Sequence, residues 1–222
     1  MKRVFLVLML GVALIMTGSA YALDFSNNVS AGGRFGGILP LNGAYDTQDD
    51  LKDIVDLGPY FGLDLGYTVV KEVTVRAGFN YSWMKVKEEK RAPNLEPVLN
   101  FPSAYLKGVF NFGSIMPVDS KINPFASLGL GFYPWKITDD GLTGDAIVLP
   151  NGEEFKKSSL GINFGAGLEG FPVSSAPELA FYGGLDYHFV FMKDEDKFGN
   201  DFENQGFFTF GAGIRYYFPV SK

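Results

Sequence analysis

From about residue 28 to residue 218, apolar or aromatic residues occupy every second position, and Gly, Ser, Asn or charged residues fill the positions between them. The segment from Phe61 to Tyr67, FGLDLGY, shows the alternation most clearly. Successive side chains of a β-strand point to opposite faces, so such a segment predicts a strand with one apolar face and one small or polar face. The pattern recurs about eight times, and no helix-period segment is long enough to cover the apolar face, which predicts a transmembrane β-barrel.

The strands are separated by connections of two kinds. The short connections are Val70–Val73, 113–123 and 171–177, and the long, charged connections are 40–58, 86–101, 137–156 and 193–204. Such asymmetry is typical of a closed antiparallel up-and-down barrel with short periplasmic turns and long outer loops. In the first long loop, Thr47 to Leu57 is expected to form a short helix that ends at Gly58. The strands are expected at 28–39, 59–70, 73–85, 102–113, 124–136, 157–170, 178–192 and 205–218.

The volumes of the side chains decide which face points outward. The interior of a barrel of about eight strands is only just wide enough for side chains to fill. The apolar parity carries too many rings for that interior: Phe61, Phe79, Tyr81, Trp83, Phe110, Phe132, Phe164, Phe181, Phe189, Phe208, Phe210 and Tyr216. The other parity is rich in glycine, which suits a crowded lumen: Gly62, Gly66, Gly78, Gly129, Gly131, Gly161, Gly165, Gly167, Gly211 and Gly213. We therefore expect the aromatic residues to face lipid.

The N-terminus has the pattern of an export signal. Residues 1–3 are a short positive region, 4–15 are apolar, and 20–22 read Ala-Tyr-Ala, a small-x-small cleavage site. As a transmembrane helix the apolar stretch would be too short. We expect a signal peptide over residues 1–22 and a single barrel domain over 23–222.

Composition excludes two classes of protein. The chain has no Cys, so it is not an exported disulfide scaffold. Without residues 1–22 it has 17 basic and 25 acidic residues, a formal net charge of −8. Such acidity argues against nucleic acid as a partner.

The end of the last strand resembles a known assembly signal. Residues 211–218 read GAGIRYYF. They resemble the C-terminal β-signal by which bacterial outer-membrane barrels are recognised for assembly, with Gly213, Tyr216 and Phe218 at its Gly-x-x-aromatic-x-aromatic core and Gly211 at its usually polar position. Residues 124–132, PFASLGLGF, resemble the P-[YF]-x-x-x-G-x-G strand of small OmpA/OmpX-like barrels.

This resemblance to the OmpA/OmpX-like outer-membrane β-barrel-domain family covers essentially the whole mature chain. It implies a monomer in the bacterial outer membrane, whose partners are outer-membrane lipid, lipopolysaccharide and the outer-membrane assembly machinery. It also implies a lumen plugged by ion-pair networks, as small barrels of this kind commonly have. No cofactor is expected.

Charged residues of both signs have the parity of the lumen. Three are acidic and four are basic: Arg34, Asp64, Arg76, Lys107, Glu169, Asp186 and Arg215. An unpaired charge would be costly in a narrow lumen, so their near balance predicts ion pairs. Counting from the strand ends places Arg34, Asp64, Lys107 and Asp186 near mid-barrel and the others toward the periplasmic end. We expect a static plug; a gate that opens by partner exchange is the alternative, to be tested by charge reversal of Asp64 and Lys107.

The only histidine, His188, lies two residues from Asp186 on the same face of one strand. A His beside a carboxylate can act as a general base, and some outer-membrane barrels modify lipid A with His, Ser and an acid. Such a site also needs a nucleophile and an oxyanion donor, yet Ser82 and Ser103 lie on strands that are not neighbours of this one. We expect no catalytic residue, and place His188 in the lumen charge network, bonded to Asp186 or a nearby Tyr.

The outer loops are mainly acidic, and loops on a rigid scaffold often carry binding functions. The acidic residues are Asp46, Asp49, Asp50, Asp53 and Asp56 in the first loop, Asp139, Asp140, Asp145, Glu153 and Glu154 in the third, and Asp194, Glu195, Asp196, Asp201 and Glu203 in the fourth. The fragment from Asp194 to Gly199 begins like a calcium loop, but Phe198 and Gln205 stand at ligand positions, so no metal site is expected. Aromatic loop residues, namely Tyr45, Phe198 and Phe202, are candidates to cap the barrel mouth.

These observations predict an integral outer-membrane protein with a plugged lumen, which acts in structure or surface interactions and binds an extracellular ligand through its acidic loops. One alternative is a channel or transporter for small or hydrophobic solutes, which would enter between the loops and leave through a lateral gap. The least favoured alternative is a lipid A-modifying enzyme.

Overall fold

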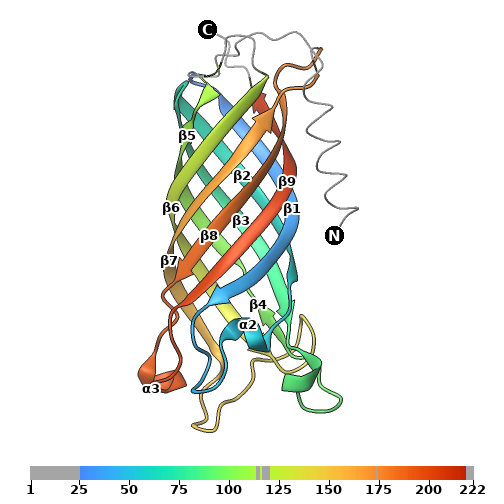
Figure 1. The fold of residues 1–222 in the computed structure, drawn as a ribbon, viewed down its shortest axis with the longest axis vertical. Helices are drawn as coiled ribbons and strands as arrows, with labels where there is room; N and C mark the ends of the chain where they lie inside the picture. Colours follow the sequence, from blue (N-terminus) through green and yellow to red (C-terminus); the bar gives the residue numbers. More distant parts are fainter. Residues whose placement is uncertain (1–25, 114–115, 117–120, 174, 219–222) are drawn as a thin grey trace.

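The computed structural model describes residues 26–113, 116, 121–173 and 175–218, so the predicted signal peptide lies outside the described residues. The regular secondary structure of the described residues is almost entirely strand (Figure 1). The strands are β1 (Val29–Asn42), β2 (Gly58–Val70), β3 (Val73–Lys85), β4 (Val98–Asn100), β5 (Ser103–Asn111), β6 (Ile122–Thr138), β7 (Lys156–Gly170), β8 (Leu179–Val190) and β9 (Gln205–Phe218). The short helical segments are α2 (Leu51–Ile54), η1 (Glu88–Lys90) and α3 (Glu195–Phe198). Within the described residues, no helix is long and apolar enough to cross a membrane.

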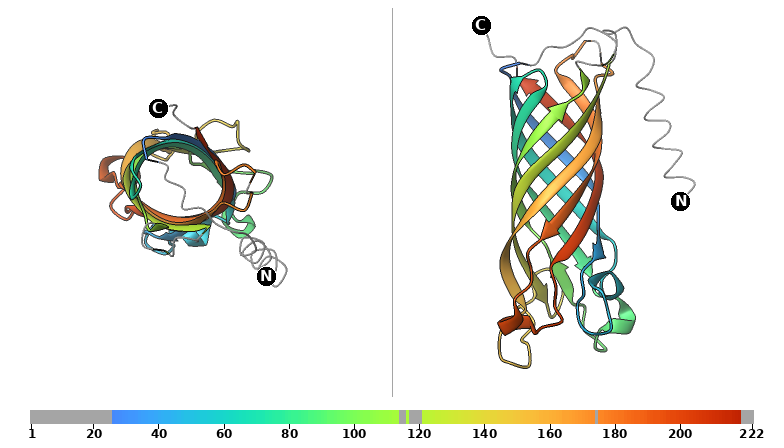
Figure 2. Two further views of the ribbon diagram at one scale, coloured as in Figure 1. Left: turned by 90° about the horizontal axis from the view of Figure 1, so that it is seen from above. Right: turned by 60° about the vertical axis from the view of Figure 1, so that its left-hand side comes forward.

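The strands pair antiparallel around a closed ring (Figure 2). β9 returns to pair with β1, in a register that joins Val29 to Phe218 and reaches Asn42 opposite Gly206. β4 and β5 share one place, between β3 and β6. The predicted closed antiparallel barrel of eight strands is therefore confirmed.

The strand expected over 102–113 is interrupted by Pro102. It begins earlier, as β4, and ends at Asn111. The registers of β4 and β5 against β6 continue without a shift across the break, so the two pieces form one strand of the barrel. Phe101 N–H donates to Ser82 O of β3 at 2.8 Å, but Pro102 has no N–H and cannot join the ladder. The ends of the other seven strands differ from expectation by at most three residues.

The outer wall of the barrel is apolar. Large hydrophobic side chains are exposed at alternate positions, up to 67% for Phe35 and Leu130. A contiguous belt of this kind is the lipid-facing surface of a transmembrane barrel. The expected orientation is confirmed, because the outward set is exposed and the glycine set lines the lumen: Phe61, Phe79, Phe132 and Phe164 are exposed, and Gly62, Gly66, Gly131 and Gly161 are buried.

The two ends of the barrel differ. The turn between β2 and β3 lies at one end, and the long loops with α2, η1 and α3 lie at the other, which is drawn below in Figure 1. The helix expected over Thr47–Leu57 is shorter than predicted, since α2 spans only Leu51–Ile54. Asp50 precedes it in extended conformation, and Val55 already pairs with Val86 in an isolated β-bridge. A β-pairing in the loop thus ends the helix early.

β1 and β9 approach so closely that Gly36 has no room for a side chain. A β-carbon there would lie against the carbonyl oxygen of Phe210 and 2.6 Å from Cα of Gly211. At Gly33, on the outer face, the nearest atom would be Cδ2 of Leu63 at 3.5 Å. We expect Gly36→Ala to lower the free energy of unfolding by roughly 1–3 kcal/mol or more, and Gly33→Ala to lower it much less. Urea titration in detergent, followed by heat-modifiable migration on gels, measures both; equal effects would contradict this account.

Candidate functional site

The charged residues expected in the lumen all lie there, and each comes from a different strand of the barrel. They are at most nine per cent exposed: Arg34 on β1, Asp64 on β2, Arg76 on β3, Lys107 on β5, Glu169 on β7, Asp186 on β8 and Arg215 on β9. They point inward because side chains alternate along a strand and the apolar residues take the outward positions. Their ion pairs form two adjoining clusters.

The first group, which we call the balanced cluster, holds two arginines and two acids. Arg215 Nη2 lies 2.9 and 3.1 Å from the two carboxylate oxygens of Asp64, and its Nη1 bonds to Glu169. Arg76 reaches the same two acids, at 3.5 Å to Asp64 and 3.4 Å to Glu169. Tyr217 Oη donates to Glu169 at 2.7 Å. Each buried charge in this cluster therefore has opposite charges beside it.

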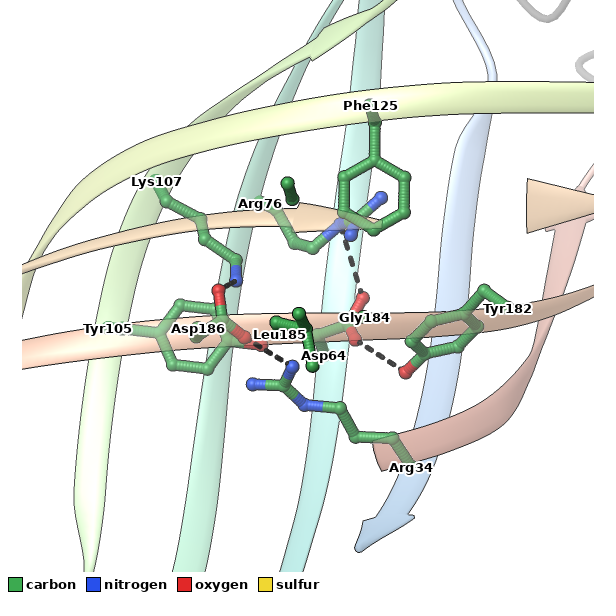
Figure 3. Close-up of a pocket in the computed structure, with 11 residues that line it drawn as sticks. Arg34, Asp64, Arg76, Tyr105, Lys107, Phe125, Tyr182, Gly184, Leu185 and Asp186 are labelled. Carbon is green, nitrogen blue, oxygen red and sulfur yellow. Dashed lines mark hydrogen bonds and ion pairs between the residues drawn. The ribbon is translucent and has the colours of Figure 1, made fainter. Parts of the chain in front are cut away.

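The second group, which we call the Asp186 cluster, places two bases on one carboxylate. Arg34 Nη1 lies 2.5 Å from one oxygen of Asp186, and Lys107 Nζ lies 3.0 Å from the other. Figure 3 shows the two bases approaching Asp186 from different sides. The guanidinium of Arg34 also lies 4.7 Å from the ring centre of Tyr60, and Lys107 Nζ lies 4.8 Å from that of Tyr105.

The partners of Asp64 differ from the grouping made on the sequence. We expected Asp64 in the mid-barrel group with Lys107, but it pairs with Arg76 and Arg215. Lys107 pairs with Asp186 instead. Charge reversal of Asp64 and Lys107 is thus no test of partner exchange, because these two belong to different clusters.

His188 is buried beside the charges, but its direct partners are hydroxyl groups. Its Nδ1 lies 2.9 Å from Tyr133 Oη and its Nε2 lies 3.2 Å from Thr209 Oγ1. Of the two bonding partners expected for it, a Tyr is present, while the carboxylate of Asp186 bonds to Arg34 and Lys107. The expected bond to a nearby Tyr is therefore confirmed, and the charged groups are neighbours of His188 rather than its direct hydrogen-bond partners.

The two serines weighed as nucleophiles are engaged elsewhere. Ser82 Oγ donates to Phe101 O at 2.9 Å, and Ser103 Oγ accepts from Asn80 Nδ2 at 3.1 Å. They lie on β3 and β5, whereas His188 lies on β8 between β7 and β9. The geometry therefore does not bring either of these serines together with His188 and an acid in the way that nucleophilic catalysis needs.

Toward the loop end the lumen becomes apolar. The ring of Phe101 lies 4.3 Å from that of Phe207 and 5.4 Å from that of Tyr133. This apolar layer consists of Ile38, Tyr60, Met84, Leu99, Phe101, Tyr133, Trp135, Val190 and Phe207, all buried. Nothing in the alternation of the sequence pointed to Phe101, which precedes the Pro102 break.

Beyond this layer, on the side of the loops, aromatic residues of three long loops pack against one another and against the end of β6. We call this group the aromatic cap: Tyr45, Trp135, Phe155, Phe198 and Phe202. Ring centres lie 4.9 Å apart for Phe198 and Phe202, 5.2 Å for Phe155 and Phe198, and 5.4 Å for Trp135 and Phe198. Tyr45, Phe198 and Phe202 were expected at the mouth. Phe155, missed because it stands alone among charged residues, lies at the centre of the group.

Electrostatics at the cap favour a charged first loop. The backbone N–H groups of Gln48 and Asp49 donate to Asp46 Oδ1 at 2.8 and 2.9 Å, and they hold the pKa of this carboxyl below its ordinary value. Burial, and then the charge of Asp46, raise the pKa of Tyr45. At neutral pH, Asp46 is therefore ionised and Tyr45 is neutral.

The fragment that begins like a calcium loop forms the start of α3. Asp194 Oδ1 accepts the backbone N–H of Lys197 at 3.3 Å, so this carboxylate caps the helix. Across the part of the chain that the structure describes, no three His, Cys, Asp or Glu side chains are grouped as a metal ion would require.

The residues of the expected assembly signal divide between the two faces of β9. Gly211 and Gly213 face the lumen, and a β-carbon on Gly213 would lie against the carbonyl of Gly33. Tyr216 and Phe218 face outward, 41% and 46% exposed, with ring centres 5.0 Å apart. Recognition of these residues during assembly stays a prediction.

The fold is shared with solved outer-membrane proteins. OprG of Pseudomonas aeruginosa is 12% identical over 90% of this chain and 99% of its own, with a TM-score of 0.53. The outer-membrane protein AlkL is 14% identical over 93% of this chain and 95% of its own (TM-score 0.52), and Neisserial surface protein A is 15% identical over 87% and 98% (TM-score 0.51). No family model and no curated protein matches the chain. The resemblance to small eight-stranded outer-membrane barrels is confirmed at the level of the fold.

Removal of one buried charge should disrupt the plug. Glu169 is fully buried and bonds to Arg215, Arg76 and Tyr217. We expect Glu169→Gln to lower the free energy of unfolding by roughly 3–5 kcal/mol, because both arginines lose a counter-charge.

The matched control is Glu154→Gln in the third loop, where an exposed ion pair with Lys156 is lost. Its expected cost is below about 1 kcal/mol. Urea titration of both variants in the same detergent makes the comparison, and a cost for Glu169→Gln as small as that of the control would refute the structural role of this cluster.

Proposed function

We propose that the protein is an integral protein of the bacterial outer membrane, exported with a cleaved signal peptide, that serves as a structural or surface-interaction protein. No solute passes through its lumen, and its loops present an acidic surface outside the cell. The observation that supports this most is that the lumen is filled twice, by the paired charges and by the apolar layer with the aromatic cap. Its partners are outer-membrane lipid and lipopolysaccharide, the assembly machinery, which would read β9, and an extracellular ligand.

The two fillings obstruct the lumen by different means. The ion pairs join strands that are far apart in the sequence and are not neighbours in the sheet. Asp64 of β2 pairs with Arg215 of β9, and Arg34 of β1 pairs with Asp186 of β8. To break them in a low-dielectric interior is costly. The polar groups of the apolar layer are already bonded, Tyr60 to Asn80, Tyr133 to His188 and Trp135 to Ser159, and its other side chains offer a hydrated ion no hydrogen bond. A polar solute would have to disrupt both.

The cap supports a role in surface interactions. Because residues of three loops share one aromatic cluster, the loops form a preformed head rather than independent tethers, which reduces the ordering cost of binding. Several of its acids are held by loop lysines, such as Asp49 by Lys90 and Asp194 by Lys157. Asp140, Asp145, Asp196 and Asp201 are exposed on the same head, so it presents negative charge to a cationic partner.

A row of lysines supports lipopolysaccharide as the lipid partner. Lys136 of β6 stands directly opposite Lys156 of β7, at outward positions beside the loops. Like charges placed opposite each other are destabilising. In the structure Lys136 donates to Gly144 O and Lys156 pairs with exposed Glu154, and an anionic headgroup can replace such an exposed pair at little cost. Lys85 and Lys193 extend the row, and their loop partners, Glu96 at 3.3 Å and Glu195 at 2.7 Å, are exposed pairs that exchange at little cost.

Neutralising the head should weaken its interactions. We expect replacement of Asp140, Asp145, Asp196 and Asp201 by Asn to slow association with cationic extracellular proteins on the order of tenfold at low salt. Binding of cells that produce each variant to an immobilised panel of such proteins measures this. The Asp→Glu variant at the same positions keeps the charge and should keep the binding. If cells that produce either variant bind the panel no differently from cells without the protein, the result argues against this function.

One observation favours the alternative of a path for hydrophobic solutes. The registers on either side of the break place Pro102 directly opposite Pro134 of β6. Phe101 N–H donates to β3, and Ile137 N–H donates toward β7, so the two proline nitrogens face each other across the β5–β6 seam. Neither can donate a hydrogen bond. The seam is thus weakened beside the apolar layer, where a lateral gap would have to form.

The prolines allow this alternative to be tested. If the weakened seam were a route, Pro102→Thr with Pro134→Thr would restore two ladder donors and slow the entry of an apolar solute into proteoliposomes several-fold, whereas Pro59→Thr on β2 would not. If the barrel is plugged, we expect no flux of a polar solute in liposome swelling. We then also expect the apolar solute to enter proteoliposomes of all these variants at the same rate. Sustained polar flux through the wild-type protein would overturn the plug.

A further inference from the structure

The buried charges of the lumen do not sum to zero. Among the described residues, the buried charged side chains are four bases and three acids. A net charge in a narrow interior surrounded by apolar side chains is strongly unfavourable unless something compensates it. The lumen therefore has one positive charge too many.

The excess lies at one place. In the balanced cluster, Arg76 and Arg215 are matched by Asp64 and Glu169. In the Asp186 cluster, one carboxylate serves both Arg34 and Lys107. The side chain of Arg34 is only 8% exposed, that of Lys107 4% and that of Asp186 5%. Water outside the barrel does not screen them well.

Donors remain unused at the same place. Arg34 bonds to Asp186 through Nη1 alone, and its Nε and Nη2 are buried without a partner among the described residues. Lys107 Nζ has one carboxylate partner, Asp186, although an ammonium group can donate three hydrogen bonds. These donors are suited to an acceptor that carries negative charge.

A small cavity adjoins them. Arg34, Lys107 and Asp186 line it together with Asp64, Arg76 and Tyr105 (Figure 3). About 10 Å³ of it is open to the centre of a water-sized sphere, which is room for about one such species. Gly184, which has no side chain, contributes to the space. A phosphate or sulfate ion would not fit, but a single-atom anion would.

We propose that a small monovalent anion of the halide class, chloride being the commonest, binds in this cavity on the spare donors of Arg34 and Lys107. The anion completes the charge balance of the plug, so that the lumen holds four positive and four negative charges. It is a structural ligand of the barrel, and its site is distinct from the loops and the outer wall.

The first test needs no variant. Crystals of the detergent-solubilised protein grown with sodium bromide should show an anomalous bromine peak in the cavity between Arg34 and Lys107. In solution, the unfolding midpoint at fixed ionic strength and heating rate should be higher in chloride than in gluconate, which is too large for the cavity. At ten times the dissociation constant we expect a rise of roughly 3–5 °C.

A pair of variants separates this site from general salt effects. Lys107→Met leaves Arg34 and Asp186 as a one-to-one pair, so the chloride dependence of the midpoint should disappear. Lys156→Met on the outer wall is the matched control and should keep it. Equal midpoints in chloride and gluconate for the wild-type protein, with no bromine peak, would overturn the proposal and indicate that Lys107 is neutral; so would a chloride dependence that survives in Lys107→Met.

Discussion

The width of the lumen is the constraint on which the other features depend. An eight-stranded sheet closes around so little space that bulky rings have to point outward and glycine has to occupy much of the inner face. Any charge that remains inside is cut off from bulk water and needs a partner within reach. The contacts of Arg215 with Asp64 and Glu169 follow directly, because each of these side chains is buried, and β2 and β7 each lie only two strands away from β9 around the ring.

The same narrowness explains why the protein changes character along its axis. Where charged side chains fill the lumen, ion pairs join strands that are not neighbours in the sheet, such as β3 with β7 and β5 with β8. Toward the loops, rings such as Phe101 and Phe207 fill the section by packing alone. The cap continues this packing beyond the barrel, with Phe155 and Phe198 drawn from different loops. One chain thus combines a polar core, an apolar core and an apolar outer surface.

Parity along the strands was sufficient to predict the barrel, its orientation and the identity of the lumen charges, because a period of two decides which residues share a face. It could not predict partners. Asp64 joined the arginines of β3 and β9 rather than Lys107, since partners across a barrel depend on the stagger of the strands, which no single segment encodes. The bonding of His188 to Tyr133 and the place of Phe155 were likewise hidden, because both arise from contacts between segments far apart in the chain.

The pairing of β1 with β9 has a consequence for biogenesis. The two strands at opposite ends of the described chain form the last seam, from Val29 opposite Phe218 to Asn42 opposite Gly206. Until β9 pairs with β1, the sheet leaves one edge at β1 and one at its other end without a partner, and such edges template aggregation. Closure therefore depends on a meeting of β1 and β9, the two described strands that are farthest apart in the sequence, and an incomplete sheet exposes both edges until they meet.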